Sequence, residues 1–263
     1  MSSDEEGGTM MDNRHAGGSY EELVRREIRR WEWQLHKPPH VLERASKSVQ
    51  SSLNRRIPER VHNSITAAVK SIVHTALFSA EYLPKSKPFF GATLAQSDER
   101  ADEILDRYKK WAAAEGAGTG AGGILLGMVD FPLLLGIKMK FLFELAQAYG
   151  YPTKALHERL FILNTFQLAF SSPEKKAALL KVIKDWPVHE QVLVSASNYE
   201  EHIDWRQLQQ EYRDTIDFRK LLQLVPGVGA IIGAWANYGL LEELGNTGKN
   251  CYRLRRLHVP DTN

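Results

Sequence analysis

One stretch, residues 116–151, constrains this chain more than any other. It reads GAGTGAGGILLGMVDFPLLLGIKMKFLFELAQAYGY, so closely spaced glycines lead into an apolar segment that is interrupted by Asp130 and Pro132. Each glycine in a helix costs about 1 kcal/mol relative to alanine. So many glycines in one element predict either close contacts with another backbone or an irregular backbone.

A second, similar stretch lies at residues 221–241 and reads LLQLVPGVGAIIGAWANYGLL. Both stretches contain GxGA followed by apolar residues, and each leads to an acidic residue, Glu144 in the first case and Glu242, just after the stretch, in the second. This weak internal repeat predicts two glycine-rich helical segments that pack against each other at the centre of one domain. The glycines expected at helix packing or membrane contacts are Gly118, Gly120, Gly123, Gly227, Gly229 and Gly233.

Most of the remaining chain has the pattern of amphipathic helices. Ser19 and Glu22 form a capping box, and apolar residues then recur at helical spacing until Pro38 stops the pattern. Further helices are expected to start at about residues 40, 58, 97, 152, 172 and 205. Because no segment alternates apolar and polar residues as a strand does, the predicted fold class is all-α.

Size and composition predict one helical domain over residues 19–257, a disordered tail over residues 1–18 and a short tail over residues 258–263. The chain has 263 residues, of which 43% are hydrophobic, enough for a sizeable core. Its 34 basic and 32 acidic residues are too balanced for a dedicated nucleic-acid-binding protein. A single cysteine excludes an intramolecular disulfide framework and fits a reducing compartment. The acidic, polar start has no apolar signal region, so a cytoplasmic location is expected.

No catalytic, cofactor or metal motif is recognisable. Gly118, Gly120 and Gly123 match GxGxxG, but the preceding residues are helical, and the dinucleotide motif requires a strand there. Neither glycine-rich stretch ends in GK[ST], and the nine histidines show no HExxH spacing. Cys251 has no nucleophile motif around it. The prediction is therefore no enzyme activity, no cofactor and no metal.

Both glycine-rich stretches are also long enough to span a bilayer. Residues 116–137 contain one charge, Asp130, and residues 221–241 contain none. A central Asp opposes insertion by roughly 3 kcal/mol, and basic residues flank both stretches on both sides. These features favour hairpins that stay on one side of a membrane, either buried in protein or dipping into the bilayer.

Three sets of residues are candidate sites. Asp130 is interpreted as the cap of a helix entered through Pro132, or else as an ion or proton site or the partner of a terminal arginine. Asn237 is the corresponding polar residue in the second stretch. Phe89 and Phe90, in an expected loop, either tuck under it or contact a partner or lipid. The basic residues near the C-terminus form a solvated face or a patch for acidic lipids or a partner; they are Lys249, Arg253, Arg255 and Arg256.

Several motifs together resemble the EcsC family. They are GAGTGAGGILLGMVDFPLLL, FELAQAYGY, ERLFIL, VPGVGAIIGAWANYG and YRLRRL, and the resemblance covers residues 19–257. The matching positions are Gly118, Gly120, Asp130, Pro132, Gly227, Gly229, Asn237, Arg253 and Arg256. The family is named after a protein encoded beside the bacterial Ecs ABC transporter, so the resemblance implies a cytoplasmic or membrane-peripheral accessory role. It implies no catalytic residues.

Residue pattern and resemblance together lead to three hypotheses. The first is a non-enzymatic accessory protein of ABC transport or secretion that lies at the inner face of the cell membrane. Its glycine-rich hairpins would bind the membrane surface or a membrane protein. The second is a soluble helical enzyme or a carrier of an apolar ligand, with a pocket near Asp130. The third is a homo-oligomer in which the glycine-rich helices pack between chains.

Overall fold

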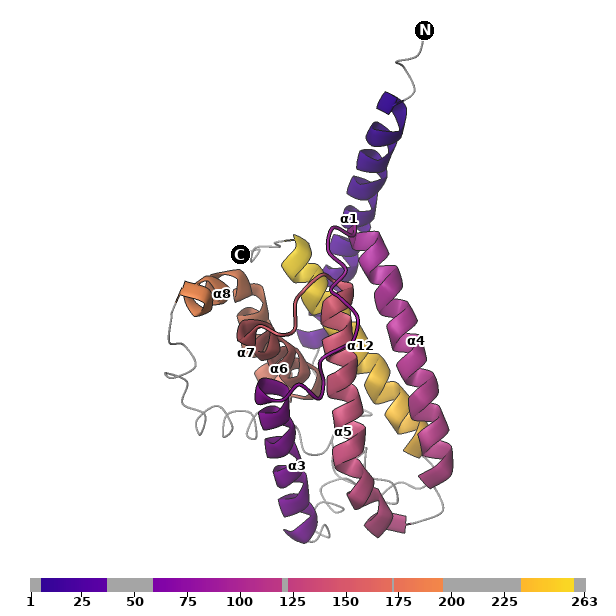
Figure 1. Cartoon of the computed structure of the whole chain (residues 1–263), viewed down its shortest axis with the longest axis vertical. Coiled ribbons are helices and arrows are strands. Elements are labelled where there is room, and N and C mark those ends of the chain that lie inside the picture. The colour runs from indigo at the N-terminus through magenta and orange to yellow at the C-terminus, as the bar shows by residue number, and fades with distance from the viewer. Residues whose placement is uncertain (1–5, 37–58, 120–122, 172, 196–232, 258–263) are drawn as a thin grey trace.

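The computed structural model describes residues 6–36, 59–119, 123–171, 173–195 and 233–257. Within these ranges the protein consists of helices without strands, so the all-α prediction is confirmed (Figure 1). The helices are α1 (Glu6–His36), α3 (Glu59–Phe78), α4 (Leu94–Thr119), α5 (Gly123–Ala148), α6 (Leu156–Phe170), α7 (Pro173–Lys184), α8 (Trp186–Ser195) and α12 (Gly233–Leu257).

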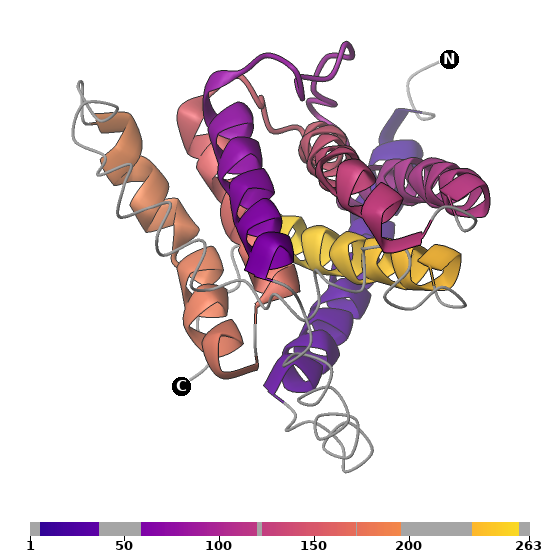
Figure 2. The same ribbon diagram turned by 90° about the horizontal axis from the view of Figure 1, so that it is seen from below.

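The long helices α4 and α12 lie side by side and run in opposite directions. Moving down α4, Asp98 pairs with Arg253, Asp102 with Lys249, and Lys109 with Glu242. As the residue numbers rise along α4, those of the paired residues on α12 fall, so the two helices are antiparallel. The end of α4 and the start of α12 therefore lie at the same end of the bundle (Figures 1 and 2).

This arrangement brings parts of the two glycine-rich stretches to one end of the molecule. Gly118 lies in the last turn of α4, Gly123 begins α5 and Gly233 begins α12. The first stretch is thus divided between two helices and is not one glycine-rich helix. Gly120, Gly227 and Gly229 lie outside the described residues, as do the helices expected from about residues 40 and 205.

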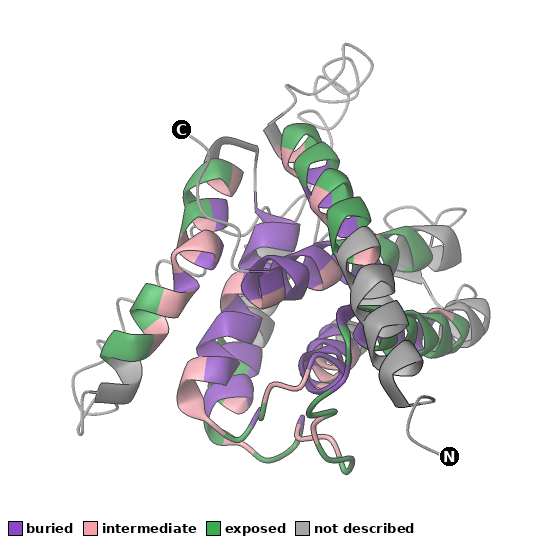
Figure 3. Cartoon of the chain, turned by 90° about the horizontal axis from the view of Figure 1, so that it is seen from above, coloured by how far each residue is buried: buried purple, intermediate pink, exposed green. Residues whose placement is uncertain are grey.

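The core lies where α5, α6 and α12 meet, and the outer helices cover it (Figure 3). Nearly all of α6 is buried, as expected for a helix that is apolar on every side. Its Phe161 ring packs against both Tyr252 of α12 and Trp186 of α8. Ile28 and Ile72, each in a predicted apolar stripe, are also buried. The apolar pattern therefore identified much of the core correctly.

Several boundaries differ from those expected. The helix α1 begins at Glu6, not at Ser19, because an established helix extends through weakly favourable residues at little cost. The helix α4 begins at Leu94, where Thr93 and Gln96 cap it by exchanging hydrogen bonds of 3.0 and 3.2 Å. These two residues form the capping box that the sequence interpretation overlooked.

The predicted break at Asp130 and Pro132 is wrong. The helix α5 runs from Gly123 to Ala148 without interruption, so no helix begins at Pro132 for Asp130 to cap. An interior proline costs about 3 kcal/mol, and the packing of α5 against α3 and α4 offsets this. The side chain of Asp130 is outside the described set, so its other predicted roles stay predictions.

Two glycines that the sequence interpretation missed make the close helix contacts. A Cβ at Gly245 would lie 2.6 Å from Cδ1 of Leu105 on α4. At Gly248 it would lie 2.5 Å from Cδ2 of Leu145 on α5. Both distances are shorter than normal van der Waals contact, so α12 packs closely against both helices because it has no side chain at these positions.

We expect Gly245→Leu to lower the free energy of unfolding by about 1–3 kcal/mol, because the new side chain would overlap Leu105. Chemical denaturation with urea measures this change. Gly239→Ala is the matched control, since nothing lies within 4 Å of its added Cβ. This control should gain up to about 1 kcal/mol through helix propensity. An unchanged stability for Gly245→Leu would contradict the close packing.

Candidate functional site

The C-terminal half of α12 places arginines inside the bundle. In YRLRRL, Arg253 and Arg255 are two positions apart, so about 200° of helical rotation separates them and they point to opposite faces. Both are buried, because helices surround α12 on both faces. A buried guanidinium is stable only when carboxylates and other acceptors surround it. Neighbouring helices supply these groups in two separate clusters.

The first cluster, here called the Asp98 cluster, consists of Asp98, Arg253, Tyr20, Tyr149 and Glu27. Arg253 Nε donates to both carboxylate oxygens of Asp98, at 3.0 and 3.1 Å. The hydroxyl of Tyr20 donates to Asp98 at 2.6 Å, and the hydroxyl of Tyr149 also donates to it. A further guanidinium nitrogen, Arg253 Nη1, donates to Glu27 at 3.0 Å. One carboxylate therefore connects α1, α4, α12 and the residue that follows α5.

The second cluster, the Glu158 cluster, lies on the other face of α12. Arg255 donates to both oxygens of Glu158, each at 2.7 Å, and to Glu190 of α8 at 2.8 Å. Its guanidinium carbon lies 3.9 Å from the ring centre of Tyr151 and 4.9 Å from that of Phe161. The bidentate pair and the aromatic contacts suit arginine, whose planar group a lysine could not replace. This cluster joins α12 to α6 and α8.

The Glu158 cluster also contains a histidine and has a donor set that a metal could use. His157 Nε2 lies 3.5 Å from Glu158 and 3.4 Å from Glu190. These three residues form the one such group in the described part of the chain. However, Arg255 already bonds to both carboxylates and neutralises one of their two negative charges. The arrangement therefore fits an ion-pair network better than a metal site.

Several titratable groups in and near the clusters have strongly raised pKa values. Burial raises the pKa of Tyr151 to about 12. Burial, followed by the charge of Asp98, raises the pKa of Tyr149 well above its usual value. Burial also raises the pKa of the Cys251 thiol to about 12. These groups stay protonated at neutral pH, which suits a structural role more than proton transfer or nucleophilic attack.

Two further arginines hold the long connection between α3 and α4. Arg256 donates to the carbonyl of Ala92 at 2.7 Å and to that of Tyr149 at 3.1 Å. Arg159 donates to the carbonyls of Leu77 and Ser79, at 2.7 and 3.0 Å, where α3 ends. The connection is thus tied to α12 and α6 close to both of its ends.

The contacts of Arg253 and Arg255 contradict the prediction that these two residues bind acidic lipid or a partner, whereas for the partly exposed Lys249 and Arg256 this contact stays a prediction. Arg253 and Arg255 are 8% and 4% exposed and bond to carboxylates of the same chain. Lys249 pairs with Asp102, and Arg256 bonds to backbone carbonyls. The charges of Arg253 and Arg255 are paired inside the protein because neighbouring helices cover this part of α12, whereas the Lys249–Asp102 pair lies at the surface.

The acidic partners were missed by the sequence interpretation. Asp98 is not among the candidate residues of the sequence analysis, and Glu158 occurs there only as part of the motif ERLFIL. The one available signal was that Glu158 interrupts an otherwise apolar helix. Arg253 and Asp98 are 155 positions apart, so no local pattern connects them. The side chain of Asn237, like that of Asp130, lies outside the described residues.

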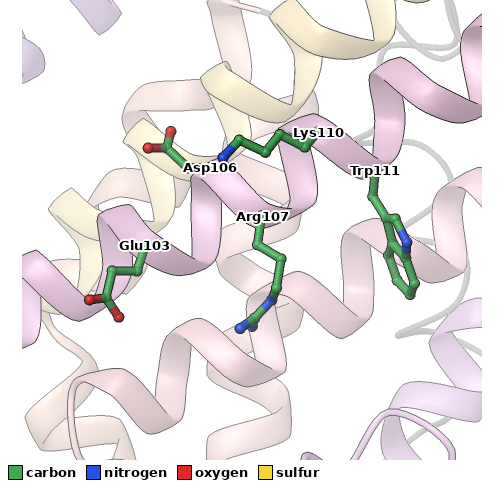
Figure 4. Close-up of a pocket in the computed structure, with 5 residues that line it drawn as sticks. All are labelled: Glu103, Asp106, Arg107, Lys110 and Trp111. Carbon is green, nitrogen blue, oxygen red and sulfur yellow. The ribbon is translucent and has the colours of Figure 1, made fainter.

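The surface hollows are shallow and charged. A groove of about 530 Å³ is lined by described residues that all come from α4 (Figure 4); they are Glu103, Asp106, Arg107, Lys110 and Trp111. Trp111 is 54% exposed. The described part of its lining is one charged helix face, unlike the apolar walls of a carrier pocket.

Comparison with known proteins agrees with the motifs. A sequence model of the EcsC protein family matches residues 22–257. Protein EcsC of Bacillus subtilis strain 168 is 43% identical over 236 residues, which cover 90% of this chain and 96% of that protein. The uncharacterised protein YdbA of the same strain is 28% identical over 251 residues, covering 88% and 91%. No solved structure matches.

None of the described helices has both the length and the apolar character needed to cross a membrane. The family match includes the YRLRRL segment and ERLFIL, the motifs that supply Arg255 and Glu158 to the second cluster. On the extent of this match and on the identity to Protein EcsC, the chain belongs to the EcsC protein family.

Proposed function

We propose that this protein is a non-enzymatic accessory protein that works at the inner surface of the cell membrane, beside transport or secretion machinery. The proposal that the protein is not an enzyme rests on the internal pairing of its buried charges. Arg253 and Arg255 each bond to carboxylates of the same chain, so neither is left to bind a substrate. A rigid bundle of this kind is suited to hold surfaces in place.

The glycine-rich end of the bundle is the proposed contact with a protein partner. The end of α4 and the start of α12 lie side by side there, and the start of α5 follows. Helices with small residues allow another backbone to approach closely, so this end suits a helix of a membrane protein or of a second copy of the chain. The family resemblance supports an ABC transporter as the class of partner.

Fractionation of cells that express the protein tests the membrane location. We expect the full-length protein in the membrane pellet at low salt and its release by an alkaline wash, as for a peripheral protein. Purified protein should also sediment with native membrane vesicles. Full recovery in the soluble fraction, together with no binding to native membranes, would contradict the proposed function.

A further inference from the structure

The connection between α3 and α4 contains a loop whose backbone is fixed. This segment, residues 84–93 with the sequence PKSKPFFGAT, is here called the diphenylalanine loop. The amide of Phe89 donates to the carbonyl of Gln147 at 2.8 Å, and the hydroxyl of Ser86 donates to the Gln147 side chain at 3.0 Å. Near the other end Arg256 holds the carbonyl of Ala92. The loop is therefore anchored to the end of α5 and to α12.

Despite this anchoring, the two aromatic side chains of the loop lie at the surface. Phe89 is 44% exposed and Phe90 is 68% exposed, so the expectation that they tuck under the loop is wrong. Gly91 follows with φ +74°, a left-handed conformation that a larger residue would rarely adopt. The backbone turns sharply after the two rings, which places them at the tip of a tight bend.

The charges of the loop are all positive. Lys85 and Lys87 are exposed, and no acidic residue occurs between position 84 and Asp98. Lys87 and Phe89 also line a hollow of about 280 Å³ together with Arg100 and other residues of α4 and α5. Cations beside exposed aromatic rings are the combination found where proteins contact anionic membrane surfaces.

The small apolar surface of the diphenylalanine loop favours lipid over protein as its binding partner. Two partly exposed phenylalanine side chains offer roughly 200 Å². A stable protein interface needs roughly 800 Å² on each partner. Insertion into the headgroup region, in contrast, needs only a few apolar side chains when cations add attraction.

We propose that the diphenylalanine loop is the lipid contact of this protein. Phe89 and Phe90 insert into the headgroup boundary of an anionic bilayer, and Lys85 and Lys87 bind its phosphate groups. This inference rests on the proposed membrane location and names the surface responsible. Because α4 extends for about 39 Å from this loop, the glycine-rich end stays away from the lipid and available to a partner.

Sedimentation of the full-length protein with protein-free vesicles tests the inference. Vesicles of phosphatidylcholine with and without phosphatidylglycerol are compared at low salt. We expect binding that requires phosphatidylglycerol and weakens as salt is added. The double variant Phe89→Ala/Phe90→Ala should bind at least about tenfold more weakly. Replacing Lys85 and Lys87 by glutamine should cost about fivefold for each lysine.

Trp111→Ala is the matched control, because Trp111 is also an exposed aromatic residue but lies on α4, outside the loop. It should bind as the parent protein does. The melting temperatures of the loop variants should stay unchanged, since the replaced side chains are exposed and the anchoring bonds come from other groups.

The possible outcomes separate the inference from the proposed function. If the parent protein binds vesicles and the diphenylalanine variant binds equally well, the loop is not the lipid contact, although the membrane location stands. Equal losses in Trp111→Ala and the loop variant would also overturn the assignment. Binding to native membranes but not to protein-free vesicles would mean that the protein binds a membrane protein and not lipid, which would overturn the assignment of the loop. Binding to neither would contradict the proposed function itself.

Discussion

Replacement of Arg255 by methionine is expected to lower the free energy of unfolding by about 3–5 kcal/mol. The change leaves the carboxylate of Glu158, which is 2% exposed, without its bidentate partner. A single charge in the interior costs far more than a pair, because no water replaces the lost hydrogen bonds. Packing of the guanidinium against Tyr151 and Phe161 is lost as well. Urea denaturation of the parent and the variant measures the difference.

The double variant Arg255→Met/Glu158→Leu distinguishes a charge effect from a packing effect. It should recover most of the loss, because an apolar pair of similar volume often replaces a buried ion pair without a large cost. Glu190 remains, but its side chain is 30% exposed and can be hydrated. Arg100→Met is the surface control, with an expected change within about 0.5 kcal/mol, because its pair with Glu103 is solvated. A double variant no more stable than Arg255→Met would contradict this explanation.

The fold class was predictable because it depends on local signals. Prolines often end helices, and α1 ends at His36, before Pro38, although α5 continues through Pro132. Apolar residues at helical spacing mark the side that faces the core, as Ile28 and Trp31 do. Neither signal requires knowledge of distant contacts. Such features can therefore be identified from the sequence alone.

The ionic clusters could not be predicted in the same way. The segment YRLRRL has the composition of an exposed basic surface, and its two interpretations were a solvated face and a patch for acidic lipids or a partner. Its true environment depends on α12 lying at the centre of the bundle, which follows from many long-range contacts together. Gly245 and Gly248 illustrate the same limit, because isolated glycines in a polar-looking helix give no sign that two helices approach them.

The surface loop is an intermediate case. Its position between two helices was expected from its proline, glycine and paired phenylalanines, and contact with lipid was one of two interpretations. The choice between them depends on whether the rings face the core or the solvent. Anchoring by Gln147 and Arg256, which are distant in sequence, turns the rings outward. Local composition therefore located the loop but could not orient it.

Asp98→Leu is the second substitution with a large expected effect, a loss of about 3–5 kcal/mol in the free energy of unfolding. Asp98 accepts hydrogen bonds from three side chains that belong to different parts of the bundle, Arg253, Tyr20 and Tyr149. Leucine fills similar space but accepts none of these bonds. Among the described residues, the buried guanidinium then keeps Glu27 and Asn250 as acceptors, and two hydroxyl groups lose theirs.

Asp98→Asn and Tyr20→Phe separate the contributions within the Asp98 cluster. Asparagine keeps one acceptor oxygen but removes the charge that compensates Arg253, so a loss of about 1–3 kcal/mol is expected. Tyr20→Phe removes one donor and leaves Asp98 bonded to Arg253 and Tyr149, so its loss should be about 0.5–1.5 kcal/mol. Equal losses for Asp98→Leu and Asp98→Asn would mean that the charge alone matters. Losses below about 1 kcal/mol for both would show that the cluster does not hold the helices together.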